Sequence, residues 1–249
     1  MDTPNKKSSF GPGFLVAAAF IGPGTVTTCT LAGANFGFAL MFSLLFAVLT
    51  TLFLQEMTGR LSLASGKDLG ESLREYPRHR WTKSLFILLT LSSITIGCAA
   101  YEAGNIIGGS LGLEMLTGIP QKIWAVIISL AAVFLLGQQK YRVVERFLIA
   151  LVFLMSISFL ATAIIMKPNL GEVFRGFIPS FPKDSLFIVL ALVGTTVVPY
   201  NLFLHASAVK NKWSSLAQLK DVRKDLVLSI SLGGVISISI VITSAMAFF

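Results

Sequence analysis

The sequence predicts an all-helical integral membrane protein with about seven spans, and three observations lead to this class. Of its 249 residues, 54% are hydrophobic and only 13% are charged, whereas about a quarter of the residues in soluble domains are charged. Apolar runs of about 20 residues, the length that crosses a bilayer core, recur along the chain. Two of these runs carry a proline near the middle, which favours a transporter with two interrupted helices.

The apolar runs also set the expected spans. They lie at residues 12–34, 37–57, 84–109, 122–138, 147–166, 185–209 and 226–249. A very short connection near Asn35 is expected between the first two. Cys29 and Cys98 fall inside apolar runs without metal-ligand spacing, so we expect small packing residues rather than a disulfide or a metal site. The run after Lys6 and Lys7 shows no clear cleavage site and is expected to be a retained first span.

The distribution of Lys and Arg predicts a cytoplasmic N-terminus. With that end inside, 16 of the 20 Lys and Arg residues fall in inner segments and 4 in outer segments. Cytoplasmic loops of membrane proteins carry this excess of positive charge. The net charge of +8 is therefore explained by membrane topology and does not indicate nucleic-acid binding. In a bacterium, this multi-pass protein would lie in the inner membrane.

Two further segments leave alternatives open. The inner segment from Arg60 to Lys83 contains GKDLGESLREYPRHR, which fits either a short amphipathic helix along the membrane surface or a solvated loop. It does not resemble a phosphate-binding loop, because its glycines are sparse and no strand precedes them. The last apolar run ends at Phe249 without a polar exit. We expect a truncated chain, and the alternative is a complete protein that ends at the outer face.

The two interrupted runs indicate the site. The first contains Gly22-Pro23-Gly24, and the sixth reads LALVGTTVVPYNLFLHASAV with Pro199 near its middle. Proline lacks the N–H that a helix interior needs, and glycine favours non-helical angles. One break would be explained by a simple kink, whereas two breaks five spans apart match inverted five-helix repeats of the LeuT-like type. A substrate is then expected between the breaks, near the bilayer midplane, where freed carbonyls serve as ligands.

These repeats divide the chain into segments. We expect a cytoplasmic N-terminus at 1–11, the first five-helix repeat at 12–166, and the start of the second repeat, with the sixth and seventh spans, at 184–249.

Several motifs resemble the NRAMP family of metal transporters. Gly11-Pro12-Gly13 followed by AAFIGPGT is similar to the family's first helix, which usually reads GPG…DPGN. Four further matches follow in order: GANFG at 33–37, QEMTGRLSLASGKDLGE at 55–71, AAYEAGNIIGGSLGLEML at 99–116, and VGTTVVPYNLFLHASAV at 193–209. In the last of these the family typically has GATVMPHNLYLHSA. The resemblance covers essentially the whole chain. It implies two inverted repeats with about eleven or twelve spans and symport of protons with divalent metals such as manganese or iron.

The inferred metal site departs from the family pattern. By the resemblance, the Asp and Asn of DPGN correspond to Gly22 and Thr25, the Ala and Met of the sixth helix to Thr195 and Val198, and the His to Tyr200. No carboxylate or thioether remains at these positions. A sulfur ligand favours softer metals, whereas hard cations such as Mg²⁺ prefer oxygen ligands and retained water. The remaining carbonyls and hydroxyls suit a hydrated cation or a small polar solute better than a bare transition metal.

Two ionisable residues inside the runs are candidates for a proton relay. Glu102 falls where the family carries acids on its proton route, with Asn105 at what we take to be a second such position. His205 matches a family His on the same helix as Tyr200. Ionisable residues at such depth are functional or paired. The alternatives are a structural partner for Glu102 and a helix-packing hydrogen bond for His205.

We therefore predict a secondary transporter of a metal cation, divalent by resemblance, that works by alternating access. Its expected partners are the lipid bilayer, the transported cation and protons; no cofactor and no nucleic acid are expected. No Ser-His-Asp set, paired carboxylates or Cys/His cluster supports an enzyme. The alternatives are a divergent transporter of a hydrated hard cation or a non-metal solute, and a non-transporting membrane fragment.

Overall fold

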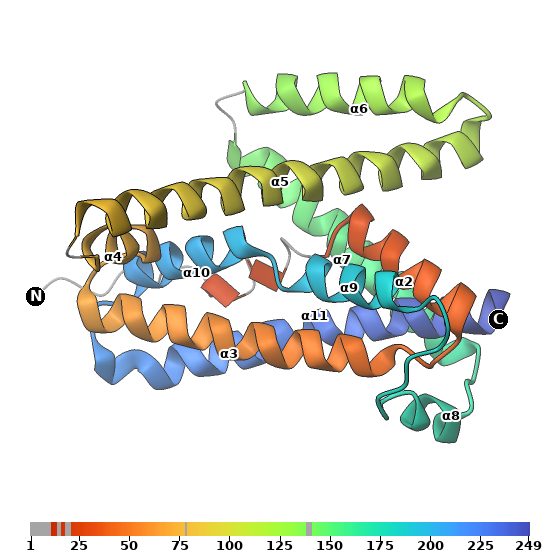
Figure 1. Cartoon of the computed structure of the whole chain (residues 1–249). Helices are drawn as coiled ribbons and strands as arrows, with labels where there is room; N and C mark the ends of the chain where they lie inside the picture. The colour runs from red at the N-terminus through yellow and green to blue at the C-terminus, as the bar shows by residue number, and fades with distance from the viewer. Residues whose placement is uncertain (1–10, 14–15, 18–20, 78, 138–140) are drawn as a thin grey trace, which may run out of the picture.

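The computed structural model describes residues 11–13, 16–17, 21–77, 79–137 and 141–249, and no strand occurs among them. The side chains of residues 136 and 141–149 are outside this description. The labelled helices (Figure 1) are α2 (Pro23–Phe36), α3 (Met41–Ser65), α4 (Leu69–Glu75), α5 (Arg80–Thr117), α6 (Gln121–Leu136), α7 (Tyr141–Ile165), α8 (Leu170–Arg175), α9 (Leu186–Thr196), α10 (Pro199–Lys212) and α11 (Leu219–Phe248).

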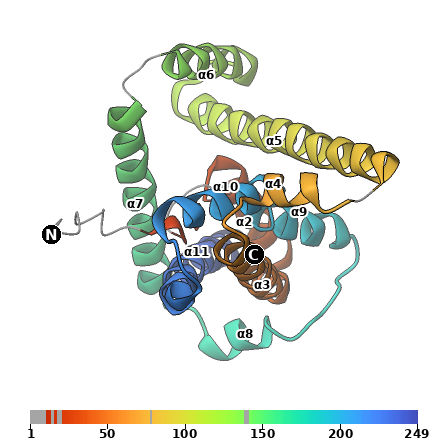
Figure 2. The same cartoon turned by 90° about the vertical axis from the view of Figure 1, so that its left-hand side faces the viewer.

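Helix α2 lies at the centre of the bundle. It packs against α11, α5 and α9, while α3 packs against α11, α10 and α9. In Figure 2, viewed along the bundle, α5 and α6 lie on one outer side and α7 on another. The largest buried apolar cluster joins four helices through Cys29, Leu44, Leu192 and Ile240. The expectation that Cys29 is a small packing residue is confirmed, and Cys98 is half-buried, with both thiols free.

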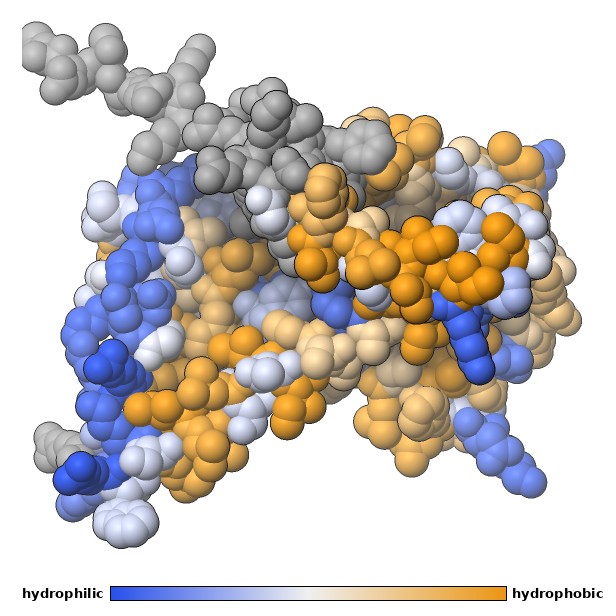
Figure 3. Space-filling view, turned by 90° about the horizontal axis from the view of Figure 1, so that it is seen from above, coloured by the Kyte–Doolittle hydropathy of each residue, from blue (hydrophilic) through white to orange (hydrophobic). Residues whose placement is uncertain are grey.

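Four helical segments are long and apolar enough to cross a membrane: Met41–Ser65, Arg80–Thr117, Leu186–Lys212 and Leu216–Phe248. Gln121–Leu135 and Ala150–Ile165 are apolar but shorter. In Figure 3, apolar surface fills the middle of the molecule, and hydrophilic residues gather at the end that carries α4. The chain is an integral membrane protein. The first expected span lies partly outside the described residues, as do Lys6, Lys7 and the rest of 1–10.

Helix bounds differ from the sequence prediction where glycine, rather than polarity, ends a helix. A short connection is found close to the one expected near Asn35, but it lies slightly later, because α2 continues to Phe36 and the turn occupies residues 37–40. Gly37 has φ 57°, and its N–H donates to the carbonyl of Gly33 at 2.9 Å, a conformation that glycine adopts without strain. Gly66, with φ 69°, ends α3 in the same way. The second span is therefore longer than expected.

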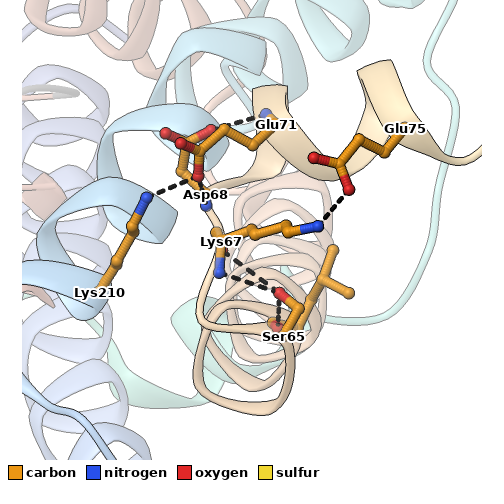
Figure 4. A network of polar contacts seen from close by, with 7 residues as sticks. Ser65, Lys67, Asp68, Glu71, Glu75 and Lys210 are labelled. Carbon is orange, nitrogen blue, oxygen red and sulfur yellow. Dashed lines mark hydrogen bonds and ion pairs between the residues drawn. The ribbon is translucent and has the colours of Figure 1, made fainter.

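The segment between α3 and α5 forms a short helix, α4, with no buried residues. It begins with a capping box, in which Glu71 N donates to Asp68 Oδ1 and Asp68 N to Glu71 Oε2, both at 2.8 Å. Glu71 also pairs with Lys210 of α10 at 2.6 Å, and Lys67 pairs with Glu75 (Figure 4). The hydrogen bond from Lys210 holds the pKa of Glu71 below its usual range. Helix α4 is thus tied to α10 at the charged end of the bundle.

Candidate functional site

Helices α2 and α10 begin in the same way, each with a proline at its first position. Gly22 precedes Pro23 with φ −132° and ψ 180°, and Val198 precedes Pro199 with φ −96° and ψ 125°. A residue before proline is driven to this extended region, and proline is favoured at the first position of a helix. Neither Gly22 nor Val198 makes a side-chain cap. The prolines named from the sequence therefore start helices here.

The end of α9 supplies backbone oxygens beside the second of these starts. Val197 is non-helical, and its N–H donates to the carbonyl of Val193 at 2.8 Å. The carbonyl of Thr196 accepts a 3.4 Å hydrogen bond from the hydroxyl of Thr51, a buried residue of α3. Carbonyls in the last turn of a helix lack intrahelical partners and carry partial negative charge. This is the end of a helix that attracts a cation.

Helix α5 contributes polar side chains to the start of α2. Asn105 Oδ1 accepts a hydrogen bond from Gly24 N at 3.1 Å, and Asn105 Nδ2 donates to Glu102 Oε2 at 3.4 Å. A Cβ atom at Gly22 would lie 3.0 Å from Asn105 Oδ1. Glu102 is thereby linked through one amide to the backbone at the start of α2.

Tyr101 connects the two helix starts. Its hydroxyl lies 3.5 Å from the hydroxyl of Thr25, which is fully buried. Its ring packs edge-on against Tyr200, with centroids 5.9 Å apart and an interplanar angle of 73°. Of the site residues taken from the sequence, Gly22, Thr25 and Tyr200 are thus joined by side chains of α5.

Thr195 and Val198 are placed differently. The hydroxyl of Thr195 donates to the carbonyl of Leu192 in its own helix at 3.1 Å. Val198 is only 4% exposed and offers no polar side-chain atom. Within the described residues, no hydrogen bond joins either side chain to α2 or α5. At Val198, a polar contact with a substrate would have to come from the backbone. At Thr195, it would come from the backbone or from the hydroxyl after rotation away from the carbonyl of Leu192.

His205 lies in a different polar region, between α10 and α3. The ring is fully buried, and its Cε1 atom lies 3.1 Å from where a Cβ at Gly59 would be. Neither ring nitrogen makes a hydrogen bond with the described residues. The amide of Asn201, one turn before His205, is likewise buried without such a partner. No contact among the described residues joins His205 to Glu102.

The donor set at the helix starts is largely neutral. It comprises backbone carbonyls, the hydroxyls of Thr25, Tyr101 and Tyr200, and the Asn105 amide, with Glu102 as the neighbouring carboxylate. The described residues hold no group of three or more His, Cys, Asp or Glu side chains that could bind a metal ion. Such oxygens can accept hydrogen bonds from the water shell of a cation, but they provide little charge to replace that shell.

Sequence reasoning missed Tyr101 and the bond from Gly24 to Asn105. Tyr101 and Asn105 are spaced by one helical turn on α5, and so share a face with each other. That periodicity could have grouped them, but it could not identify their partners, because the Gly24–Asn105 bond joins positions 81 residues apart.

Comparison with known proteins gives one consistent family. Residues 13–249 match the family described as natural resistance-associated macrophage protein-like, or Nramp. A divalent metal cation transporter MntH of Brucella suis is 32% identical over 255 residues, covering 97% of this chain and 54% of the relative. A natural resistance-associated macrophage protein 2 homolog of Dictyostelium discoideum is 31% identical over 254 residues, covering 98% of this chain and 39% of the relative.

Solved structures agree with the sequence comparison. Crystal structures of two variants of the Eremococcus coleocola manganese transporter superpose with a TM-score of 0.72 at 25% identity, covering 98% of this chain and 54% of that one. The chain spans about half the length of most of these proteins and less of the Dictyostelium relative.

Proposed function

Because the chain belongs to the Nramp family, we propose that it forms part of a membrane transporter that moves a metal cation by alternating access. The observation that carries this proposal is the pair of proline-started helices, α2 and α10, joined through Tyr101 and Asn105 of α5. The relatives support it, since they are named as divalent metal cation or manganese transporters. None of these names is that of an enzyme.

The proposed architecture is the inverted-repeat fold, with helix 1 interrupted before α2 and helix 6 interrupted between α9 and α10. Residues 12–166 would form the first repeat and residues 184–249 the start of the second, preceded by a cytoplasmic segment at 1–11. The orientation rests on charge. The end of the bundle that holds α4, the start of α5 and the end of α10 carries the segments richest in Lys and Arg.

The donor set favours a cation that keeps part of its water. Gly22 and Val198 contribute no ligand side chain, and the hydroxyls of Thr25 and Tyr200 are neutral oxygen donors. Mg²⁺ dehydrates reluctantly and prefers oxygen, whereas Mn²⁺ and Fe²⁺ gain more from nitrogen and sulfur ligands. A hydrated hard cation is therefore the second candidate substrate beside the transition metals carried by the named relatives.

Proton coupling is a separate proposal. Glu102 and His205 are the ionisable residues of the candidate relay, and they lie on different helices without a contact among the described residues. His205 is buried with no well-formed hydrogen bond at either ring nitrogen, so a proton route through it would require water or a rearrangement of α10. Glu102 has the shorter connection to the break, through Asn105.

Uptake of Mn²⁺ and Mg²⁺ into liposomes that contain the complete protein carrying this chain tests the proposal, with metal-sensitive and pH-sensitive dyes inside. Entry of Mn²⁺ would support the divalent transition metal as substrate, and entry of Mg²⁺ alone would support the hydrated hard cation. If neither ion enters through folded protein, metal transport is refuted. Internal acidification that depends on Glu102 would support coupling, and metal entry without proton movement would refute it.

A further inference from the structure

Helix α2 begins without a cap of its own. The first N–H groups of a helix have no intrahelical partner, and an Asp, Asn, Ser or Thr side chain just before the helix commonly accepts one of them. Gly22 occupies that position and has no side chain to offer. The N–H of Gly24 instead donates to Asn105 Oδ1 of α5 at 3.1 Å. The cap is therefore supplied by another helix.

The same amide fills the space beside Gly22. A Cβ atom at Gly22 would lie 3.0 Å from Asn105 Oδ1, and one at Gly24 would lie 3.2 Å from it. A carboxylate added at Gly22 would meet an oxygen acceptor where it needs a donor, because its natural partner, the N–H of Gly24, is already bonded to that oxygen.

Asn105 is held in place on both sides. Its Nδ2 donates to Glu102 Oε2 at 3.4 Å. One turn further along α5, a Cβ at Gly108 would lie 2.7 Å from Thr27 Oγ1 and 2.9 Å from the carbonyl of Pro23. Helices α5 and α2 therefore approach as closely as a glycine allows, which fixes the height of Asn105 against the start of α2.

We propose that Asn105 is a specificity-determining residue, which takes both the space and the capping role of an acidic side chain at position 22 and so keeps the helix break neutral. Gly22 and Asn105 act as a pair. The inference builds on the proposed cation transport and identifies which residues exclude a direct carboxylate ligand for a transition metal. Neither substitution alone converts the site, whereas changing both lets a carboxylate cap Gly24 and face the cation.

The test is a double-mutant cycle with Gly22→Asp, Asn105→Ala and both together, made in the complete protein. Thermal stability in lipid nanodiscs and Mn²⁺ affinity by titration calorimetry are the two measurements. Ser110→Ala is the matched control for the α5 change, because the Ser110 hydroxyl is buried and, among the described residues, bonds to the carbonyl of Ile107 in its own helix at 3.0 Å. Its combination with Gly22→Asp should be additive.

We expect each single change to lower the melting temperature, and the double variant to recover part of that loss. Residues in direct contact show such non-additivity, whereas distant ones do not. The double variant should also bind Mn²⁺ about tenfold more tightly than Gly22→Asp alone, the size of effect expected for neighbouring residues that interact. Asn105→Ala alone releases the space but adds no carboxylate, so it should not improve Mn²⁺ binding. The Mn²⁺ affinity therefore distinguishes a role in specificity from a role in packing.

Additive losses of stability, with equal Mn²⁺ affinity in Gly22→Asp and the double variant, would overturn the pairing. If Gly22→Asp does not fold by itself, Gly22→Ala replaces it in the stability cycle, with Gly97→Ala as its control, because a Cβ at Gly97 meets nothing within 4 Å. Parallel uptake by the unchanged protein keeps the two proposals apart. If the stability changes are additive and the unchanged protein transports cations, the pairing of Gly22 and Asn105 is refuted. If the changes are non-additive and the unchanged protein transports no cation, only the proposed function is refuted.

Discussion

Helices α2 and α11 pack closely together at Gly33. A substitution at this residue tests how closely the two helices approach each other. A Cβ atom at Gly33 would lie 2.8 Å from the backbone nitrogen of Ala245 and 2.8 Å from Cβ of Ser244. Beside it, the hydroxyl of Ser244 donates to the carbonyl of Thr30 at 2.6 Å. The nearest neighbours are backbone and Cβ atoms, which cannot turn away as the end of a flexible side chain can. We expect Gly33→Ala to force the two helices apart.

The magnitude follows from a comparison with Gly97 on α5, where an added Cβ meets nothing within 4 Å. Replacing glycine by alanine in a helix stabilises it by about 0.5–1 kcal/mol when space is available. Overpacking a dense interior costs about 1–3 kcal/mol, and the rigid neighbours of Gly33 favour the upper half of that range. The two substitutions, chemically identical, should therefore differ by about 2–3 kcal/mol in free energy of unfolding.

The assay is thermal unfolding of both variants in the same lipid nanodiscs, followed by tryptophan fluorescence. For a chain of 249 residues the expected difference corresponds to roughly 4–12 °C in melting temperature, and a longer protein that contains this chain would show a smaller shift. Gly33→Ala should also weaken cation binding, because the same helix carries Gly24 and Thr25. Equal melting temperatures for Gly33→Ala and Gly97→Ala would refute the crossing of α2 and α11 as described.

Three further predictions concern contacts between helices. Lys210 holds the pKa of Glu71 low, so the ion pair stabilises α4 at neutral pH and this stabilisation is lost as pH falls through the lowered pKa. The protection factors of the α4 amides, which correct for the intrinsic pH dependence of exchange, should therefore fall on acidification, and in Glu71→Gln they should be low at all pH values. Asp225 Oδ2 of α11 accepts a hydrogen bond from the N–H of Gly13 at 2.7 Å, so Asp225→Ala should destabilise the protein by about 1.5–3 kcal/mol in chemical unfolding, as expected for a hydrogen bond to a charged group. Gly108→Leu should separate α5 from α2 and reduce cation uptake, whereas Gly112→Leu, where a Cβ meets nothing within 4 Å, should not.

The sequence predicted the helices well and their ends less well, for a physical reason. Hydropathy identifies the part of a helix that lies in the hydrocarbon core of the membrane. Helix α3 continues beyond its apolar run to Ser65, and α5 starts before its apolar run at Arg80, because backbone hydrogen bonds also form between polar residues. Glycine supplied the missing boundary at Gly37 and Gly66, each with positive φ. Helix α8, which no apolar run predicted, starts at Leu170 and is capped by Asn169, whose side chain accepts a hydrogen bond from Gly171 N at 3.0 Å.

The site could be predicted only in part, because its contacts are long-range. Proline alone indicated where α2 and α10 begin, and the family resemblance indicated Gly22, Thr25 and Tyr200 as candidate site residues. Which side chain meets Gly22 depends on how α5 lies against α2, and no local pattern encodes that. The spacing of Glu102 and Asn105 shows that they share one face of a helix, but the bond to Gly24 appears only when the fold is assembled.

The neutral break and the nearby carboxylate fit together when the cation retains water. Stripping a divalent ion of its shell among neutral oxygens costs more than those oxygens return, because buried charge needs opposite charge nearby. Glu102 is one amide away from the break. A carboxylate acting across a water layer, at about 6 Å in an effective dielectric of about 20, attracts each unit of positive charge by about 3 kcal/mol. That attraction can hold a hydrated dication without touching it. If the chain transports a cation as proposed, a carboxylate in place of the Gly22 hydrogen would bind the ion directly. With the Asn105 amide filling that space, we expect water to stay between the ion and Glu102 and the size of the hydrated ion to set selectivity.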